Sequence, residues 1–145
     1  MTRDRTGIKK TTKPPRPDLG GFDMHSTVKD SVPSIPFKEI WRTVLGDRYA
    51  LSLVLCGDKL SRRLNQEYRH KDYSPNVLSF PLEKHSGEIF LNIRKAEREA
   101  KEMQTSLRAR IAHLYVHGCF HLAGYEHSDD MERREDVILS RFKLI

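Results

Sequence analysis

The sequence predicts a single α+β domain, in which a small mixed sheet of about four strands packs with about five helices. The chain has 145 residues, which is a usual length for one domain. Short apolar runs of strand length occur beside longer segments in which apolar residues repeat at helical spacing. The two kinds of segment do not alternate regularly, and no internal repeat is present, so an α+β arrangement is favoured.

Residues 1–21 are expected to form a basic, flexible N-terminal tail, followed by a folded domain of residues 22–145. In the tail, six lysines and arginines against two aspartates give a charge of +4, out of +6 for the whole chain. Its three prolines and near absence of apolar residues are typical of disordered segments. Such an arm can contact nucleic-acid phosphates or improve solubility, whereas the aspartates and prolines disfavour a mitochondrial presequence.

The first half of the domain is expected to contain two strands and two helices. Residues 24–29 are a candidate first strand, and residues 36–46 are a candidate helix that begins at a proline and ends at a glycine. Residues 49–56 have the length and the apolar composition of a buried strand. Asp58 is expected to cap a second helix that runs to about residue 68.

An exposed polar loop over residues 69–75 is expected to lead into two more strands. The first of them, residues 76–80, is predicted to stop at Pro81, because proline has no N–H group to donate within a sheet. The second covers residues 87–92 and begins at a glycine.

Three helices are expected to complete the domain. They cover about residues 93–103, about residues 106–123, and a last segment for which Ser128 or Asp129 can serve as the cap. The helix of residues 106–123 carries large apolar residues at the spacing of a buried face.

The composition favours a soluble, cytoplasmic protein. No apolar run approaches the ~20 residues of a membrane span, and the N-terminus lacks the apolar core of a secretory signal. Only two cysteines occur, Cys56 and Cys119, which is too few for a disulfide framework and agrees with a reducing compartment. We therefore expect no membrane association.

Three histidines form a candidate metal site at the C-terminal end of the central helix of residues 106–123. His117 and His121 lie one helical turn apart and share a face, so both imidazoles can reach one ion. Gly124 can end the helix without a Cβ penalty, which lets the chain turn back and present His127 as a third ligand. Three protein ligands leave the fourth position of a tetrahedral zinc ion open for water, as in catalytic sites.

The residues near these histidines limit which reactions a metal bound here can catalyse and which side chains can bind it. The spacing His-x-x-x-His-x-x-Gly-x-x-His is that of metzincin proteases, but Gly118 replaces the glutamate that those enzymes use as general base. A glycine within a helix costs about 1 kcal/mol relative to alanine, which suggests a close approach to the backbone there.

Cys119 points about 200° round the helix from His117, away from a metal. His113 lies about 12 Å along the axis from His121, too far to share an ion, and is expected in the core or else beside the ligands.

The stretch from His117 to His127 resembles the zinc motif of the YbeY family of endoribonucleases, His-Gly-x-Leu-His-Leu-x-Gly-Tyr-Asp-His. Three upstream segments also resemble that family in order and spacing. They are Leu64-Asn65 with Tyr68-Arg69, Val77-Leu78-Ser79-Phe80-Pro81, and Gly87-Glu88-Ile89. The resemblance covers roughly residues 50–143 and leaves the basic tail unaccounted for.

The resemblance implies a zinc-dependent endoribonuclease, specific for single-stranded RNA, that acts in ribosomal RNA maturation and ribosome quality control. Its implied partners are ribosomal RNA and, with it, the ribosome or small-subunit proteins. One Zn²⁺ ion is implied, bound by His117, His121 and His127. His117 and Arg69 are the implied catalytic residues, and Arg69 is the candidate phosphate clamp because its planar guanidinium suits phosphate oxygens.

Some residues depart from the family pattern. Glu126 stands where the family has aspartate. It is expected to orient a ligand histidine without binding the metal itself, and His113 is expected to have the same kind of role. The extra methylene of Glu126 could shift the affinity or geometry of the metal site. Phe120 replaces leucine, Glu88 replaces aspartate, and Pro75 stands where the family usually has threonine.

Two other functions remain open on the sequence alone. One is a metal-dependent hydrolase of another substrate, including an atypical metzincin-like peptidase, and Gly118 counts against the peptidase. The other is a noncatalytic, ribosome-associated module in which zinc only stabilises the fold.

Overall fold

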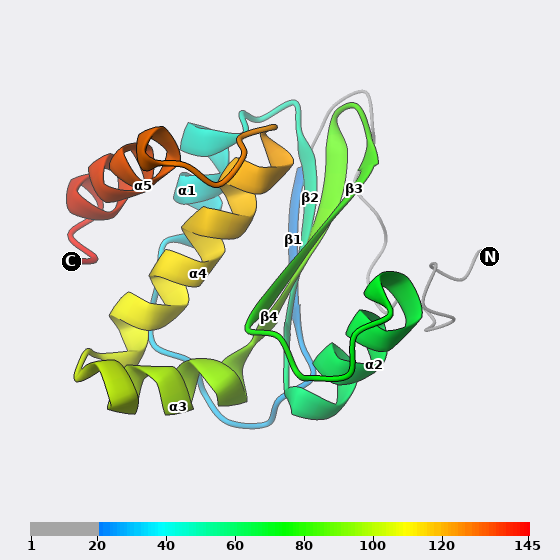
Figure 1. The fold of residues 1–145 in the computed structure, drawn as a ribbon. Helices are drawn as coiled ribbons and strands as arrows, with labels where there is room; N and C mark the ends of the chain where they lie inside the picture. Colours follow the sequence, from blue (N-terminus) through cyan, green and yellow to red (C-terminus); the bar gives the residue numbers. More distant parts are fainter. Residues whose placement is uncertain (1–20) are drawn as a thin grey trace.

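The computed structural model describes residues 21–145, so the expectations for the basic tail fall outside the described residues. A four-stranded sheet forms the centre, in the strand order β1-β2-β4-β3. Its strands are β1 (Gly21–Ser26), β2 (Ala50–Cys56), β3 (Val77–Glu83) and β4 (Ser86–Asn92). β1, β2 and β4 run parallel, whereas β3 runs antiparallel to β4 at one edge (Figure 1). The predicted mixed sheet is confirmed.

Five helices accompany this sheet in the described part of the chain, and the last of them packs on the fourth. They are α1 (Phe37–Val44), α2 (Asp58–Arg69), α3 (Ile93–Met103), α4 (Leu107–Leu122) and α5 (Asp129–Arg141). α4 packs on β3 and β4 and is itself contacted by α1, α3 and α5, whereas α2 lies across the opposite face of the sheet (Figure 1). None of the described helices combines the length and the apolar character that crossing a membrane requires.

α4 is the central helix, and it is buried round most of its circumference because other elements surround it. Ile111, Tyr115 and Val116 are fully buried. The Tyr115 hydroxyl donates a hydrogen bond of 2.8 Å to the carbonyl of Phe37, which ties α4 to α1. Because each buried side chain of this size contributes about 1.5–3 kcal/mol, α4 is a firmly packed support for whatever its C-terminal end carries.

Two strand boundaries were predicted wrongly, and sheet pairing explains both. The first strand is Gly21–Ser26 rather than residues 24–29, because its pairing with β2 starts with Gly21 opposite Ala50. β3 does not stop at Pro81 but continues to Glu83, with an irregularity after the proline. An edge strand tolerates proline because half of its N–H groups face away from the neighbouring strand.

The bounds of α2 also differ from the prediction, and two side chains are affected. Gly57 rather than Asp58 is the N-cap residue. Asp58 is the first helical residue, and its carboxylate accepts hydrogen bonds from Asn92 at 3.0 Å and from Arg98 at 2.8 and 2.9 Å. Arg69 is the last residue of α2 rather than part of a loop, because the next residue takes the left-handed conformation that ends the helix.

Candidate metal centre

The C-terminal end of α4 brings two predicted ligands together. The Nε2 atoms of His117 and His121 lie 2.9 Å apart, and the planes of the two rings are nearly perpendicular, at 88°. Just beyond them Gly124 takes a φ of 99°, so the positive φ expected of it is confirmed. The turn brings His127 back toward the pair, and its ring centroid lies 5.6 Å from that of His117.

The partners of the two imidazoles indicate which nitrogen of each ring carries the proton. Nδ1 of His117 lies 2.6 Å from Oε2 of Glu135, and Nδ1 of His121 lies 3.2 Å from the carbonyl oxygen of Tyr125. Both partners accept hydrogen bonds, so in the neutral rings each Nδ1 donates and each Nε2 keeps its lone pair. Two lone pairs facing each other at 2.9 Å repel unless a cation binds to them. The pair therefore fits a metal ion, since ligand histidines commonly donate from their other nitrogen in this way.

The third histidine is near the pair, but the three rings do not form a finished site. Within residues 21–145, no three His, Cys, Asp or Glu side chains have the mutual spacing of a complete metal site. His127 is exposed, in the segment between α4 and α5. Three imidazoles are a donor set that catalytic zinc uses, so His127 stays the predicted third ligand.

Glu135 of α5 is the carboxylate that supports the histidine pair. Its residue exposure is 3 %, and besides its bond to His117 it lies 3.4 Å from Nε2 of His113. Burial lowers the pKa of His117, and the hydrogen bond from Nδ1 to Glu135 offsets only part of this effect. The lowered pKa favours the neutral ring, which is the form that binds a metal ion.

The sequence contains a signal for Glu135 that the prediction missed. Glu135 follows Met131 by four residues and precedes Ile138 by three, so it lies within the buried face of α5. Burying a carboxylate is costly unless it is hydrogen-bonded or paired, so a glutamate at a buried position predicts a polar partner inside the protein. The prediction instead assigned this role to Glu126, which is exposed and, within the described residues, forms no hydrogen bond with the three histidines.

His113 is not in the core as expected, because its side chain is 43 % exposed. Its Nδ1 lies 3.3 Å from Nη1 of Arg110, and its Nε2 faces Glu135. Arg110 in turn forms an ion pair of 2.9 Å with Glu99. A series of polar contacts therefore runs along α4 toward the histidine pair, and the supporting role of His113 stays a prediction.

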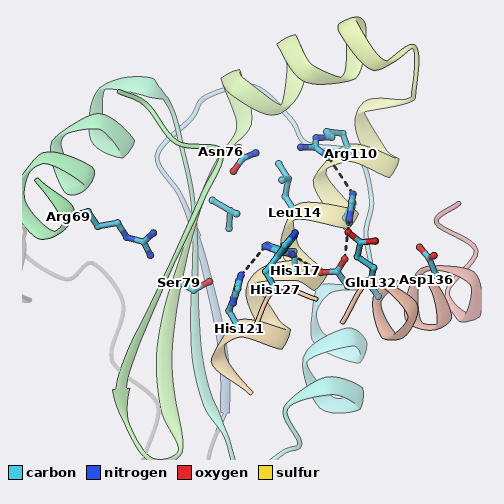
Figure 2. Close-up of a pocket in the computed structure, with 13 residues that line it drawn as sticks. Arg69, Asn76, Ser79, Arg110, Leu114, His117, His121, His127, Glu132 and Asp136 are labelled. Carbon is cyan, nitrogen blue, oxygen red and sulfur yellow. Dashed lines mark hydrogen bonds and ion pairs between the residues drawn. The ribbon is translucent and has the colours of Figure 1, made fainter. Parts of the chain in front are cut away.

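These side chains line a cleft of about 710 Å³, named the histidine cleft from here on (Figure 2). α4 and α5 form one wall, and β3 with the end of α2 forms the other. Two further acidic residues of α5, Glu132 and Asp136, line the cleft on the side opposite Arg69 (Figure 2).

Arg69 reaches the histidine cleft from the wall opposite α4. It is exposed at the end of α2, and its Cζ lies 6.0 Å from the centre of the Phe80 ring. Figure 2 shows its guanidinium turned toward Ser79 and the histidines. No carboxylate in residues 21–145 pairs with Arg69, so its N–H groups are available to an anion such as phosphate.

Gly118 and Cys119 both face the protein interior. A Cβ atom on Gly118 would lie 3.0 Å from Oγ of Ser79 and 3.2 Å from Cδ1 of Ile89, so glycine lets α4 approach β3 and β4 closely. The close approach predicted for Gly118 is confirmed. Cys119 is fully buried, and burial raises the pKa of its thiol to about 12, which agrees with its predicted orientation away from the metal.

Comparison with known proteins adds independent information. The family model of the endoribonuclease YbeY matches residues 25–143. An endoribonuclease YbeY of Pseudomonas putida is 41 % identical over 99 residues, which cover 63 % of this chain and 63 % of the relative. One from Alkaliphilus metalliredigens is 36 % identical over 113 residues, which cover 67 % of this chain and 73 % of the relative. The match thus spans less than two thirds of the length of the Pseudomonas relative.

A solved structure has the same fold. The solution structure of TM1509 from Thermotoga maritima superposes with a TM-score of 0.64, covering 85 % of this chain and 92 % of that one. The two sequences are 23 % identical, so this similarity supports the fold alone.

Proposed function

The chain belongs to the YbeY endoribonuclease family, and from this membership we propose that it is a metal-dependent endoribonuclease that cuts single-stranded RNA. The observation that carries the proposal is the pair of Nε2 lone pairs on α4, which face each other in a cleft that also contains Arg69, an arginine with no carboxylate partner in residues 21–145. The histidine pair can bind a cation, and the arginine can bind the anionic backbone of the substrate.

The chain's own residues have distinct roles in this proposal. His117 and His121 would bind one zinc ion, and His127 would be the third ligand. Zinc bound to three imidazoles keeps a position open and supplies Lewis acidity. Glu135 keeps the proton of His117 on Nδ1, so that Nε2 faces the cleft. Arg69 binds a phosphate of the RNA from the opposite wall, which positions the strand across the cleft.

We further propose that the physiological substrate is ribosomal RNA, in processing and in ribosome quality control, with the ribosome or small-subunit proteins as partners. A cytoplasmic location is part of this proposal, because Cys56 and Cys119 are both free thiols, as is usual in reducing compartments. The peptidase alternative is disfavoured by geometry as well as by sequence. A Cβ atom at position 118 would already lie 3.0 Å from Oγ of Ser79 and 3.2 Å from Cδ1 of Ile89, so the space between α4 and the sheet does not admit a glutamate there.

Metal analysis and RNA cleavage, measured together, test this function. The wild type should contain one metal ion per chain and cut a single-stranded RNA. His117→Ala should lose both the metal and the cleavage. Arg69→Ala should keep the metal and lose at least tenfold in kcat/KM, and Arg69→Lys should recover only part of it because lysine lacks the planar fork.

His85→Ala is the matched control, because His85 is exposed in the turn between β3 and β4 and lies outside the histidine cleft. It should behave as wild type in both measurements. Bound metal without cleavage of any single-stranded RNA would instead support the noncatalytic module, and absence of metal would exclude the proposed chemistry.

A further inference from the structure

A second cleft, of about 790 Å³, lies beside the first half of α2 and is named the α2 cleft here. It is formed by the segment between β1 and α1, by α2 and by the start of α3. Its lining is strongly basic, with five lysines and arginines against one aspartate. They are Lys29, Lys59, Arg62, Arg63 and Arg94, and the aspartate is Asp30.

Ion pairs already neutralise two of these five cations. Arg62 lies 2.6 Å from Oδ1 of Asp72, and Arg94 lies 2.9 Å from Oδ2 of Asp30. The remaining three, Lys29, Lys59 and Arg63, are exposed, and none of them pairs with a carboxylate within residues 21–145. Among the described residues, the α2 cleft therefore carries three positive charges without a carboxylate partner, supplied by two separate segments of the chain.

The helix α2 connects this cleft to the histidine cleft. Lys59, Arg62, Gln66 and Arg69 follow one another at intervals of three or four residues, which places them along one side of the helix. Gln66 lines the α2 cleft and Arg69 lines the histidine cleft, so the two clefts end one helical turn apart. From Lys59 to Arg69 the helix rises by roughly 15 Å.

We propose that the α2 cleft binds backbone phosphates of the same RNA strand that enters the histidine cleft. This inference rests on the proposed function and adds a second RNA-binding region, distant from the histidines. RNA fits better than an acidic protein segment, because Lys59 and Arg63 of the α2 cleft lie on the helix whose end carries Arg69 at the proposed reaction site. Lysine and arginine charges of this kind bind phosphates without regard to base sequence.

The test compares RNA binding of the wild type with that of the variant Lys29→Gln, Lys59→Gln, Arg63→Gln. The probe is a labelled single-stranded RNA of about 12 nucleotides, and its anisotropy is followed over a series of salt concentrations. The variant should bind roughly tenfold more weakly, and its slope of log affinity against log salt should fall by about 2, since each neutralised phosphate accounts for ~0.7 of that slope. A probe of about 4 nucleotides, which fits the histidine cleft alone, should bind the variant and wild type equally.

The matched control is Lys38→Gln, Arg48→Gln, Lys101→Gln, which removes the same charge from exposed sites that line neither cleft. Both variants should keep the wild-type unfolding temperature, because all six side chains are exposed. Equal reductions of RNA affinity in the two variants would overturn the proposal, as would no reduction in either. It would also be overturned if the cleft variant lost binding to polyglutamate but kept its affinity for RNA.

The failure of this inference is distinguishable from that of the proposed function. If the wild type cuts no RNA but the cleft variant still binds RNA more weakly than its control, RNA binding by the α2 cleft is supported and the catalytic proposal fails. If the wild type cuts RNA and the cleft variant has an unchanged KM for the longer probe, only the α2 cleft is excluded.

Discussion

The two walls of the histidine cleft hold their functional side chains in different ways. On the α4 wall, the side chain of His117 is 23 % exposed and is hydrogen-bonded to Glu135, which is itself buried. On the opposite wall, Arg69 is exposed at a helix end and lies over the face of Phe80. His117 on the α4 wall is fixed by packing and by its hydrogen bond to the buried Glu135, whereas Arg69 contacts one aromatic ring among the described residues.

This difference matches what each wall has to do. Metal ligands must be held close to one geometry, because a small displacement of a nitrogen atom weakens the bond to the ion. An arginine that binds phosphate acts through its charge and its N–H groups, and its long side chain can adjust to the substrate. Changes on the α4 wall are therefore expected to alter stability and metal affinity, whereas changes on the α2 side are expected to alter the binding of anions.

The largest effect on stability is expected where α4 meets the sheet. Gly118→Val would place three carbon atoms in a space where a Cβ alone already lies 3.0 Å from Oγ of Ser79 and 3.2 Å from Cδ1 of Ile89. The free energy of unfolding should fall by about 1–3 kcal/mol, with loss of metal binding as α4 moves away from the sheet. Urea denaturation measures the first effect, and metal content measures the second.

Gly118→Ala serves as the graded control, because it adds only the Cβ atom. Its loss of stability should lie between zero and that of the valine variant, since alanine also raises helix propensity by about 1 kcal/mol. A valine variant as stable as wild type would show that the packing of α4 on β3 is loose, and the contrast between the walls would then disappear.

A smaller effect, confined to the metal, is expected from Glu135→Gln. The glutamine keeps the size of the side chain but loses the negative charge that holds the Nδ1 proton of His117. Zinc affinity, measured by competition with a chelator, should fall by about 10–100-fold, while the fold is retained. Glu132→Gln is the matched control, because Glu132 lines the same cleft and is exposed on α5. Equal affinities of the two variants would argue that Glu135 has no special role.

Local patterns in the sequence predicted the mixed sheet, the helices and the histidine pair, because these depend on spacing along single segments. The positive φ of Gly124 and the close approach at Gly118 were also predictable, since each follows from what glycine alone allows. Glu135 could have been identified from its position within the buried face of α5. Glu126 was predicted for this role because it stands at the aspartate position of the resembled motif, but a motif along one segment does not specify which residues of another helix contact it.

Other features depend on tertiary pairing and were not accessible from the sequence. The continuation of β3 past Pro81 follows from its place at the edge of the sheet, which no local pattern specifies. His113 is exposed because it lines the histidine cleft, whose walls come from separate segments of the chain. The link between the two clefts through α2 likewise required the fold, because Lys29 precedes that helix by 29 residues, counted to Asp58.

The smallest effect is expected from Asp58→Asn at the start of α2, the helix that carries Arg69. The hydrogen bonds from Arg98 lower the pKa of Asp58 from 3.8 to about 2, so the ionised form is favoured in the folded state. The contribution of ionised Asp58 to the free energy of unfolding is therefore fully present above pH 3.8 and is lost as the pH falls through about 2.

Because the side chain of Asp58 is 40 % exposed, the loss of stability of the asparagine variant at pH 7 should be only about 0.5–1 kcal/mol. Urea denaturation from pH 7 to pH 2 should show the difference from wild type shrinking toward zero, and Asp47→Asn, which removes an exposed aspartate in the turn before β2, is the control for the loss of one surface charge. A difference for Asp58→Asn that stays constant over this range would mean that packing, rather than the charge, anchors this wall.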